Sequence, residues 1–160
     1  MSTFDAQKRE IVDTAQTLVQ KGYLMATGGN LSLRLPGREA FAITPSNYDY
    51  CKMKPEDVCV LDFSLNQIEG QLKPSVESAM HGAIYRVRPD VNAIIHTHQA
   101  YVSALTLIQA PIPALFDEQA RFLGRSVEII PYAPSGTGML KNTVAKHVKN
   151  HNNAFMMQNH

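Results

Sequence analysis

Two histidines separated by one residue follow three apolar residues in the stretch Ala93-Ile94-Ile95-His96-Thr97-His98. The β-branched residues favour a strand, and residues i and i+2 of a strand point to the same face, so the two imidazoles can bind one ion. Neutral imidazole is a good ligand for zinc and similar divalent metals, and a catalytic zinc site has three protein ligands and one open position. The alternative is a pair of partly buried histidines that hydrogen-bond to backbone at the end of a strand.

Two further segments contain residues that are suited to bind an anion. Gly28 and Gly29 allow backbone N–H groups to approach an anion closely, and the side chains of Thr27 and Asn30 can donate hydrogen bonds to it. Ser75 is a natural N-cap, and the N-terminus of a helix offers backbone donors and the positive end of the helix dipole. The alternatives are structural, namely a tight turn into a strand and a simple helix cap.

The remaining histidines and the two cysteines favour structural roles. His147 and His151 lie four residues apart on an expected helix, a spacing that can bind metal, but neighbouring lysines indicate a solvated face. His81 either supports Glu77 from one helical turn away or packs inside the protein, and packing is favoured. The two cysteines, eight residues apart and without a CxxC pattern, are expected to be free thiols.

Hydrophobic periodicity divides the chain into alternating helices and strands. Residues 31–35 alternate apolar and polar side chains, as in a half-buried antiparallel strand. Helices are predicted over residues 3–21, 75–89, 100–108 and 139–150. Strands are predicted over residues 31–35, 40–43, 58–62, 67–69, 91–98, 127–130 and 154–157. Interleaved helices and hairpins predict an α/β fold with three α/β/α layers, in which helices cover both faces of a mixed, mainly antiparallel central sheet.

The composition indicates one domain over residues 1–160. A net charge of +1 gives no reason to expect nucleic acid or an anionic membrane as a partner. The polar N-terminus does not resemble a signal peptide and no apolar run has membrane-spanning length, so we expect a cytoplasmic protein. Because an apolar run, residues 154–157, precedes the last residue so closely, we expect a domain that lacks its C-terminal segment.

Five motifs occur in order along the chain, and together they resemble the class II aldolase/adducin family. They are Gly28-Gly29-Asn30, Thr44-Pro45-Ser46, Pro74-Ser75-Val76-Glu77, His96-Thr97-His98 and Gln158-Asn159-His160. The resemblance covers nearly the whole chain. It implies a metal-dependent lyase of the aldolase type that acts on a small, phosphorylated sugar ketose, with Zn2+, or else Mn2+ or Co2+, as its cofactor. It also implies a homotetramer with sites between subunits.

The same resemblance assigns a role to each motif. It implies three metal ligands, His96, His98 and His160. Glu77 would be the acid/base, and Ser46 and Asn47 would belong to a second phosphate-binding loop. Retro-aldol cleavage leaves an enediolate, whose negative charge a divalent ion stabilises as a Lewis acid while a nearby carboxylate moves a proton. Without the resemblance, Glu77 would be interpreted as an acidic residue in the first turn of a helix, where its negative charge interacts favourably with the helix dipole.

Three departures from the family pattern concern the binding of the substrate and the proton donor. The sugar-phosphate aldolases carry Ser-Ser before the glutamate, whereas this chain has Ser75-Val76, and Asn47 stands where they have glycine. A tyrosine of a neighbouring subunit is their proton donor, shortly after an Ile-Pro-Ala. Here Ile112-Pro113-Ala114 is followed by no tyrosine in register, and Asp117 is the candidate substitute.

Several alternatives to an aldolase stay open. The same metal platform supports a pentulose-phosphate 4-epimerase, a dehydratase or a decarboxylase. A non-catalytic scaffold domain like the adducin head would share the fold but lack the metal histidines. A structural zinc site in a binding module would have four protein ligands and no exchangeable water.

Overall fold

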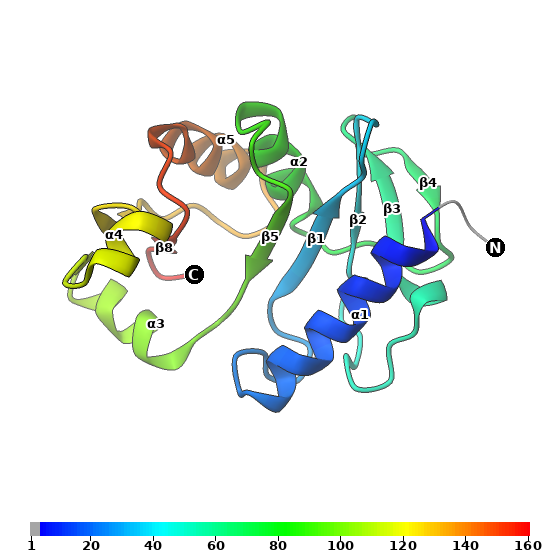
Figure 1. The fold of residues 1–160 in the computed structure, drawn as a ribbon, viewed down its shortest axis with the longest axis horizontal. Helices are drawn as coiled ribbons and strands as arrows, with labels where there is room; N and C mark the ends of the chain where they lie inside the picture. Colours follow the sequence, from blue (N-terminus) through cyan, green and yellow to red (C-terminus); the bar gives the residue numbers. More distant parts are fainter. Residues whose placement is uncertain (1–3) are drawn as a thin grey trace.

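Two sheets organise residues 4–160, which the computed structural model describes (Figure 1). The first is antiparallel, in the order β4-β3-β2-β1-β5, and contains β1 (Asn30–Arg34), β2 (Ala40–Ile43), β3 (Cys59–Asp62), β4 (Gln67–Glu69) and β5 (Ala93–His96). In the second, β7 (Ser126–Ile130) pairs antiparallel with β6 (Ile112–Pro113) and parallel with β8 (Phe155–Met157). The mixed, mainly antiparallel α/β fold is confirmed, although its strands are divided between two sheets.

The register of β1 brings the glycine-rich turn beside the histidine strand. β1 lies between β2 and β5, and its first residue, Asn30, pairs with His96 at the end of β5. Gly29 has a positive φ of 81°, and a Cβ added there would lie 2.5 Å from the carbonyl oxygen of His96. Only glycine permits both this conformation and this approach, so the turn and β5 are in direct contact.

Alternate residues of β1 face opposite helices. Leu31 lies in a core with Ile11 and Ala15 of α1 (Asp5–Gln20), which agrees with the helix predicted over 3–21 except that residue 3 lies outside the described residues. Asn30 and Ser32 point to the other face, where α2 (Ser78–Val87) covers them. The alternating pattern therefore predicted the strand correctly, but a helix rather than solvent covers its polar face.

The start of α2 differs from the prediction. Its N-cap is Glu77, so the predicted cap role of Ser75 is wrong. Ser75 instead belongs to the preceding turn, where its Oγ accepts a hydrogen bond of 3.3 Å from the backbone N–H of Glu77. The hydroxyl of Ser78 donates to the carbonyl oxygen of Ser75 over 2.6 Å. This turn places the Glu77 side chain beside β1, not on an exposed first turn.

A second core joins α2 to α5 (Gly138–His147) and to the second sheet. Met80, Ile130, Leu140 and Val144 are buried in it. Thr137 begins α5 as its N-cap, since its side chain accepts a hydrogen bond from the N–H of Leu140. A 3-10 turn, η2 (Val148–Asn150), then leads into β8.

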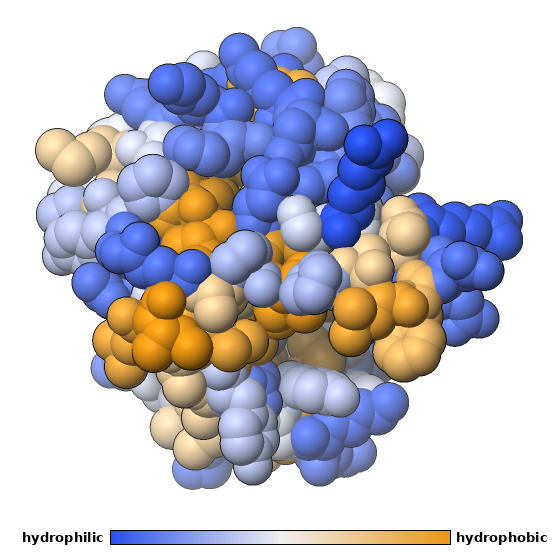
Figure 2. Space-filling model, turned by 90° about the vertical axis from the view of Figure 1, so that its left-hand side faces the viewer, coloured by the Kyte–Doolittle hydropathy of each residue, from blue (hydrophilic) through white to orange (hydrophobic). Residues whose placement is uncertain are grey.

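The region between β5 and β7 contains the elements that the sequence patterns missed. α3 (Ala100–Leu107) was predicted, whereas β6, α4 (Asp117–Phe122) and a 3-10 turn elsewhere, η1 (Pro55–Asp57), were not. This region exposes large apolar side chains: Tyr101, Leu107, Ile108, Leu115, Phe116 and Phe122. We call them the apolar face; Figure 2 shows orange residues gathered on this side of the molecule. None of the helices in residues 4–160 is both long and apolar enough to cross a membrane.

Candidate metal centre

The three histidines of the expected metal site lie together. His96 is the last residue of β5, His98 follows two residues later, and His160 lies three residues after β8. One ring nitrogen from each lies within 4.8 Å of the others, and the Nε2 atoms of His96 and His98 are 2.9 Å apart. Zinc–nitrogen bonds of about 2.0–2.1 Å in a tetrahedron place nitrogens roughly 3.3 Å apart. Small rotations of the rings would therefore suit a divalent ion.

The surroundings of His96 favour the form of imidazole that binds metal. Its side chain is buried, and burial lowers its pKa to about 4, although the negative charge of Glu77 acts in the opposite direction. His96 is therefore neutral at neutral pH and offers a lone pair. Three nitrogen donors of this kind match zinc and its neighbours among the divalent transition metals better than calcium or magnesium, which prefer oxygen.

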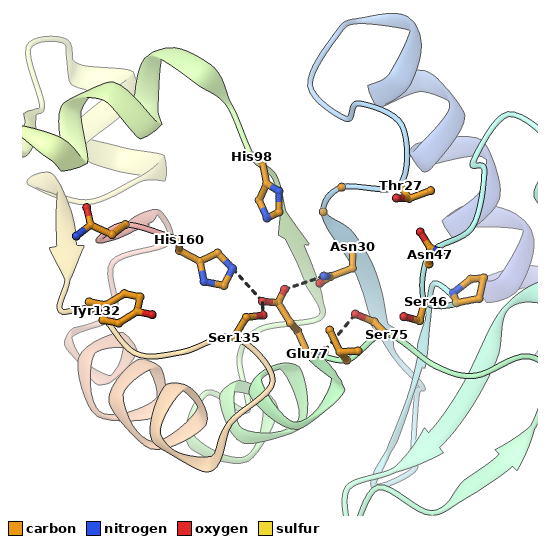
Figure 3. Close-up of a pocket in the computed structure, with 15 residues that line it drawn as sticks. Thr27, Asn30, Ser46, Asn47, Ser75, Glu77, His98, Tyr132, Ser135 and His160 are labelled. Atoms are coloured by element: carbon orange, nitrogen blue, oxygen red, sulfur yellow. Dashed lines mark hydrogen bonds and ion pairs between the residues drawn. The ribbon is translucent and has the colours of Figure 1, made fainter.

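Glu77 lies in the middle of the site, and its two carboxylate oxygens contact four groups (Figure 3). Oε1 lies 2.9 Å from His160 Nε2 and accepts a hydrogen bond of 2.9 Å from the Ser135 hydroxyl. Oε2 accepts a hydrogen bond of 2.8 Å from the Asn30 amide and lies 3.3 Å from His96 Nε2. The carboxylate is thus surrounded by donors from four different segments of the chain.

These contacts determine the protonation of Glu77. Its side chain is only 4% exposed, and burial alone would raise its pKa. The hydrogen bonds from His160, Asn30 and Ser135 outweigh burial and hold the pKa of Glu77 well below its usual range. The resting side chain is a carboxylate that can accept a proton.

A cavity of about 360 Å3 opens beside Glu77. Its lining contains every residue that the sequence assigned to substrate or phosphate binding: Thr27, Gly28, Gly29, Asn30, Ser46, Asn47 and Ser75. Glu77, His98 and His160 line it as well, while His96 lies behind them. Among the described residues, no lysine or arginine lines this cavity, so hydroxyl, amide and backbone N–H groups are its donors.

Two residues of the lining were missed by the sequence patterns. Tyr132 and Ser135 lie in the loop between β7 and α5, a stretch in which the patterns predict neither a helix nor a strand. Its proline and glycine residues are typical of a turn and carry no sign that Ser135 reaches Glu77. Asp117, the candidate proton donor, lies exposed at the start of α4 and outside the cavity of a single chain, so its role stays a prediction.

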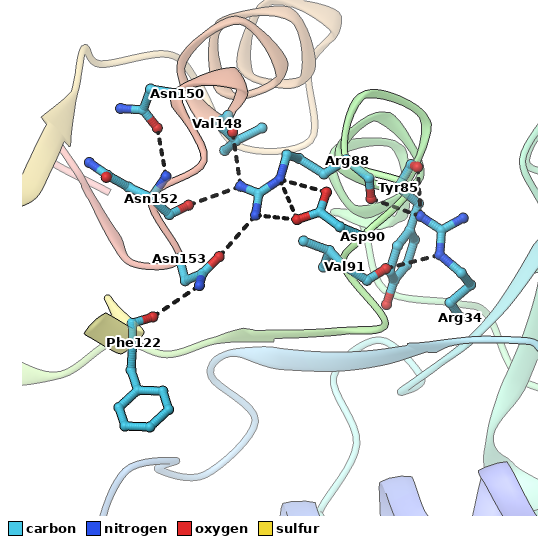
Figure 4. A network of polar contacts seen from close by, with 10 residues as sticks. All are labelled: Arg34, Tyr85, Arg88, Asp90, Val91, Phe122, Val148, Asn150, Asn152 and Asn153. Carbon is cyan, nitrogen blue, oxygen red and sulfur yellow. Dashed lines mark hydrogen bonds and ion pairs between the residues drawn. The ribbon is translucent and has the colours of Figure 1, made fainter. Parts of the chain in front are cut away.

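A buried arginine anchors the segment that carries His160 (Figure 4). The guanidinium of Arg88, at the end of α2, donates hydrogen bonds of 3.0 Å to the carbonyl oxygens of Val148 and Asn152 and one of 2.9 Å to Asn153 Oδ1. It also pairs with Asp90 at 2.8 Å. These bonds fix the turn before β8, and thereby the position of His160, relative to the helix that follows Glu77.

Comparisons with known proteins agree with this geometry. The family model described as the class II aldolase and adducin N-terminal domain matches residues 9–160. The 5-deoxy-D-ribulose 1-phosphate aldolase of Bacillus thuringiensis serovar kurstaki is 37% identical over 84% of this chain and 62% of its own length. The L-fuculose phosphate aldolase of Escherichia coli O6:H1 is 35% identical over 95% of this chain and 69% of its own length.

The comparison with solved structures agrees with the comparison of sequences. A solved structure of L-fuculose 1-phosphate aldolase superposes with a TM-score of 0.90 and 34% identity, over the whole of this chain and 74% of the other. The chain therefore belongs to the class II aldolase and adducin family. It spans 62% and 69% of the length of the two curated relatives described above.

Proposed function

We propose that this chain is a metal-dependent lyase of the aldolase type, which cleaves a phosphorylated ketose into an aldehyde and a smaller ketone. The observation that carries the proposal is the buried Glu77 carboxylate, which lies beside three histidines at one end of a cavity rich in neutral hydrogen-bond donors. His96, His98 and His160 would hold the ion, zinc or else manganese or cobalt, which would supply Lewis-acid stabilisation of negative charge.

Glu77 has the properties of the acid/base in this reaction. In cleavage, a carbon–carbon bond breaks as the adjacent hydroxyl loses its proton and becomes the aldehyde, and the electron pair remains on the other fragment as an enediolate. That fragment takes up one proton at carbon to become the ketone. The lowered pKa keeps Glu77 ionised, and the carboxylate would accept the proton in the reverse, condensing direction; by microscopic reversibility the same carboxyl group would deliver that proton in cleavage.

The opposite wall of the cavity would bind the phosphate. Gly28 and Gly29 present backbone N–H groups, and Thr27, Ser46 and Ser75 present hydroxyls. Asn47 adds an amide group, and Asn30, whose amide donates to Glu77, lies between this wall and the carboxylate. Neutral donors of this kind bind a phosphate without a lysine or arginine, and they leave the reacting carbons to point toward Glu77.

We further propose that the protein acts as a homotetramer with sites between subunits. The apolar face, on and around α3 and α4, is the surface available for such contacts. Asp117 begins α4 within this region, and a neighbouring subunit could present it to the cavity, where it would take up the proton of the substrate hydroxyl.

Measurement of ketose-phosphate cleavage tests the proposal. With zinc supplied, the protein should release a triose phosphate from L-fuculose 1-phosphate or 5-deoxyribulose 1-phosphate. Glu77→Gln should lower kcat by about 10²–10⁴-fold, the usual contribution of a general acid/base. Glu39→Gln, at an exposed site between β1 and β2, is the matched control and should leave kcat unchanged. Formation of an isomeric sugar phosphate without triose phosphate would contradict the aldolase and indicate an epimerase.

A further inference from the structure

A ladder of polar contacts runs between β1 and α2 behind Glu77. Asn30 Nδ2 donates to Glu77 Oε2 over 2.8 Å. One step further along both elements, Ser32 Oγ lies 2.6 Å from His81 Nδ1 and 2.8 Å from the Tyr85 hydroxyl. Asn30 and Ser32 share one face of β1, and the three partners, spaced by four residues, share one face of α2. All five side chains are buried.

Two atoms of this ladder, one in each step, have no hydrogen-bond partner among the described residues. They are Asn30 Oδ1 and His81 Nε2, and they are the only buried side-chain nitrogen or oxygen atoms of residues 4–160 in that condition. A buried polar atom without a partner costs about 1–3 kcal/mol, so a pair of such atoms in adjacent steps requires an explanation.

The directions of the known hydrogen bonds show which of the two atoms donates. The Glu77 carboxylate only accepts, so the Asn30 amide points its NH2 group at Glu77 and its Oδ1 acceptor away from it. The Tyr85 hydroxyl has only Ser32 as a partner among the described residues. If Tyr85 donates to Ser32, and Ser32 donates to His81 Nδ1, every hydroxyl hydrogen in the ladder is used. The proton of a neutral His81 then resides on Nε2, which becomes a donor.

The two atoms without partners lie in adjacent steps of the ladder. One turn of α2 spans about 5.4 Å and two residues of β1 span about 6.7 Å, so both elements advance by a similar length from one step to the next. Nε2 of His81 and Oδ1 of Asn30 are a donor and an acceptor, and they are not bonded to each other directly. One water that accepts a hydrogen bond from Nε2 and donates one to Oδ1 would satisfy both atoms.

We propose that His81 is a positioning residue, which carries its proton on Nε2 and, through one buried water, holds Asn30 Oδ1 so that the Asn30 amide donates to Glu77. The role rests on the proposed function of Glu77 as acid/base. Without this link, the Asn30 amide can turn its oxygen toward the carboxylate, and the Glu77 oxygens lose one of their donors. Burial lowers the pKa of His81 to about 3, in keeping with a neutral ring.

The first test does not depend on activity. In the protein labelled with 15N-histidine, the resonances of His81 should show a protonated Nε2 and an unprotonated, hydrogen-bonded Nδ1. Ser32→Ala should remove the hydrogen-bond signature of Nδ1, and Tyr85→Phe should weaken it, with both variants folded by circular dichroism. A proton on Nδ1 in the unaltered protein would overturn the proposal, because Nε2 could not then donate.

The second test separates positioning from folding. His81→Leu should lower kcat about ten-fold with KM nearly unchanged, since the loss of one buried hydrogen bond acts on Glu77 and not on substrate binding. His81→Gln, whose amide can place an N–H near the position of Nε2, should recover most of kcat. His147→Leu, on α5 and outside the ladder, is the control. An unchanged kcat in a folded His81→Leu protein would refute the positioning role of His81. If the unaltered protein has no aldolase activity, the proposed function is refuted, and the 15N spectra alone then test the protonation of His81.

Discussion

Glu77 and His81 lie one helical turn apart, and burial affects their charges in different ways. Four donor groups surround Glu77 and keep it ionised in spite of burial. His81 has a single hydroxyl at Nδ1, so burial dominates and keeps it neutral. The site therefore combines a negative Glu77 carboxylate with neutral rings at His81 and His96.

Buried neutral histidines make stability depend on pH. The unfolded chain binds a proton at His81 as the pH falls below 6.5, whereas the folded chain does so only near 3, so protonation favours unfolding in between. We expect the free energy of unfolding of the metal-free protein to fall from pH 6.5 to pH 5, by up to about 1.4 kcal/mol per pH unit for each such group. His96 contributes in the same direction, and Glu77 adds its loss only below 4.5.

Urea unfolding at several pH values, with a chelator present, measures this slope. His81→Gln should flatten it by roughly one proton between pH 6.5 and pH 5. Equal slopes in the two proteins would contradict a neutral, buried His81.

At the residue scale, the sequence predicted the convergence of His96 and His98 better than their surroundings. The spacing of His96 and His98 indicates convergence because a strand has a fixed period of two, although β5 ends at His96 and His98 lies in the loop that follows. His160, far away in the chain, was reached only through the family resemblance. Ser135 was missed because a serine in a turn is typical of any loop, and only the packing of α5 against α2 brings it to Glu77.

At the scale of elements, the contact between the glycine turn and β5 can be tested by adding one methyl group. Gly29→Ala would place Cβ 2.5 Å from the carbonyl oxygen of His96 and 2.6 Å from Leu24 Cδ2. We expect a loss of stability of about 2–4 kcal/mol, from backbone strain and overpacking together. Chemical denaturation measures it. Gly37→Ala has a similar positive φ of 69° with no atom within 4 Å, so it isolates the strain and should cost less. Equal losses in both variants would show that the contact with β5 has no effect.

The connection between α2 and the turn before β8 depends on Arg88. Arg88→Met should lower the free energy of unfolding by about 2–4 kcal/mol, because the buried carbonyl oxygen of Val148 and the partly buried one of Asn152 lose a charged donor. Arg86→Met, on the exposed side of the same helix, is the control and should have little effect. Denaturant midpoints compare the two, and a stable Arg88→Met protein would contradict the anchoring role.

The elements that were predicted and those that were missed differ in length and periodicity. α1, β1 and α5 have clear apolar spacing, and the predicted ends agree with the structure except at the C-terminus of α5, where the 3-10 turn η2 replaces the last helical turn. α4 and β6 are too short for a periodic signal, and prolines flank or occupy β6. The start of α2 was misplaced because Ser75 satisfies the pattern of an N-cap, while tertiary contacts of Glu77 hold the preceding turn open.

At the scale of the whole molecule, the apolar face predicts self-association. A chain of 17.7 kDa that forms a tetramer should elute with four times that mass in light scattering. Leu115→Asp should lower the mass, because it places a charge within this face, where Leu115 is 73% exposed. Ile68→Asp, on β4 in the other sheet, is the matched control and should not change it. A monomeric parent would contradict the tetramer.

The architecture was more predictable than the arrangement of its sheets. Interleaved helices and hairpins gave the α/β class, because each amphipathic element must cover another. The separation of β5 from β8 into two sheets could not be predicted, since pairing between distant strands leaves no periodic signal in either strand.

The metal content of the purified protein tests the central claim most directly. After incubation with zinc and removal of unbound ion, mass spectrometry should find about one divalent ion per chain, and the double variant His96→Ala, His98→Ala should lose it. The double variant His147→Ala, His151→Ala removes the same number of histidines outside the site and should keep the ion. An unaltered protein that binds no zinc, manganese or cobalt, or a double variant at His96 and His98 that still binds one ion per chain, would contradict the account.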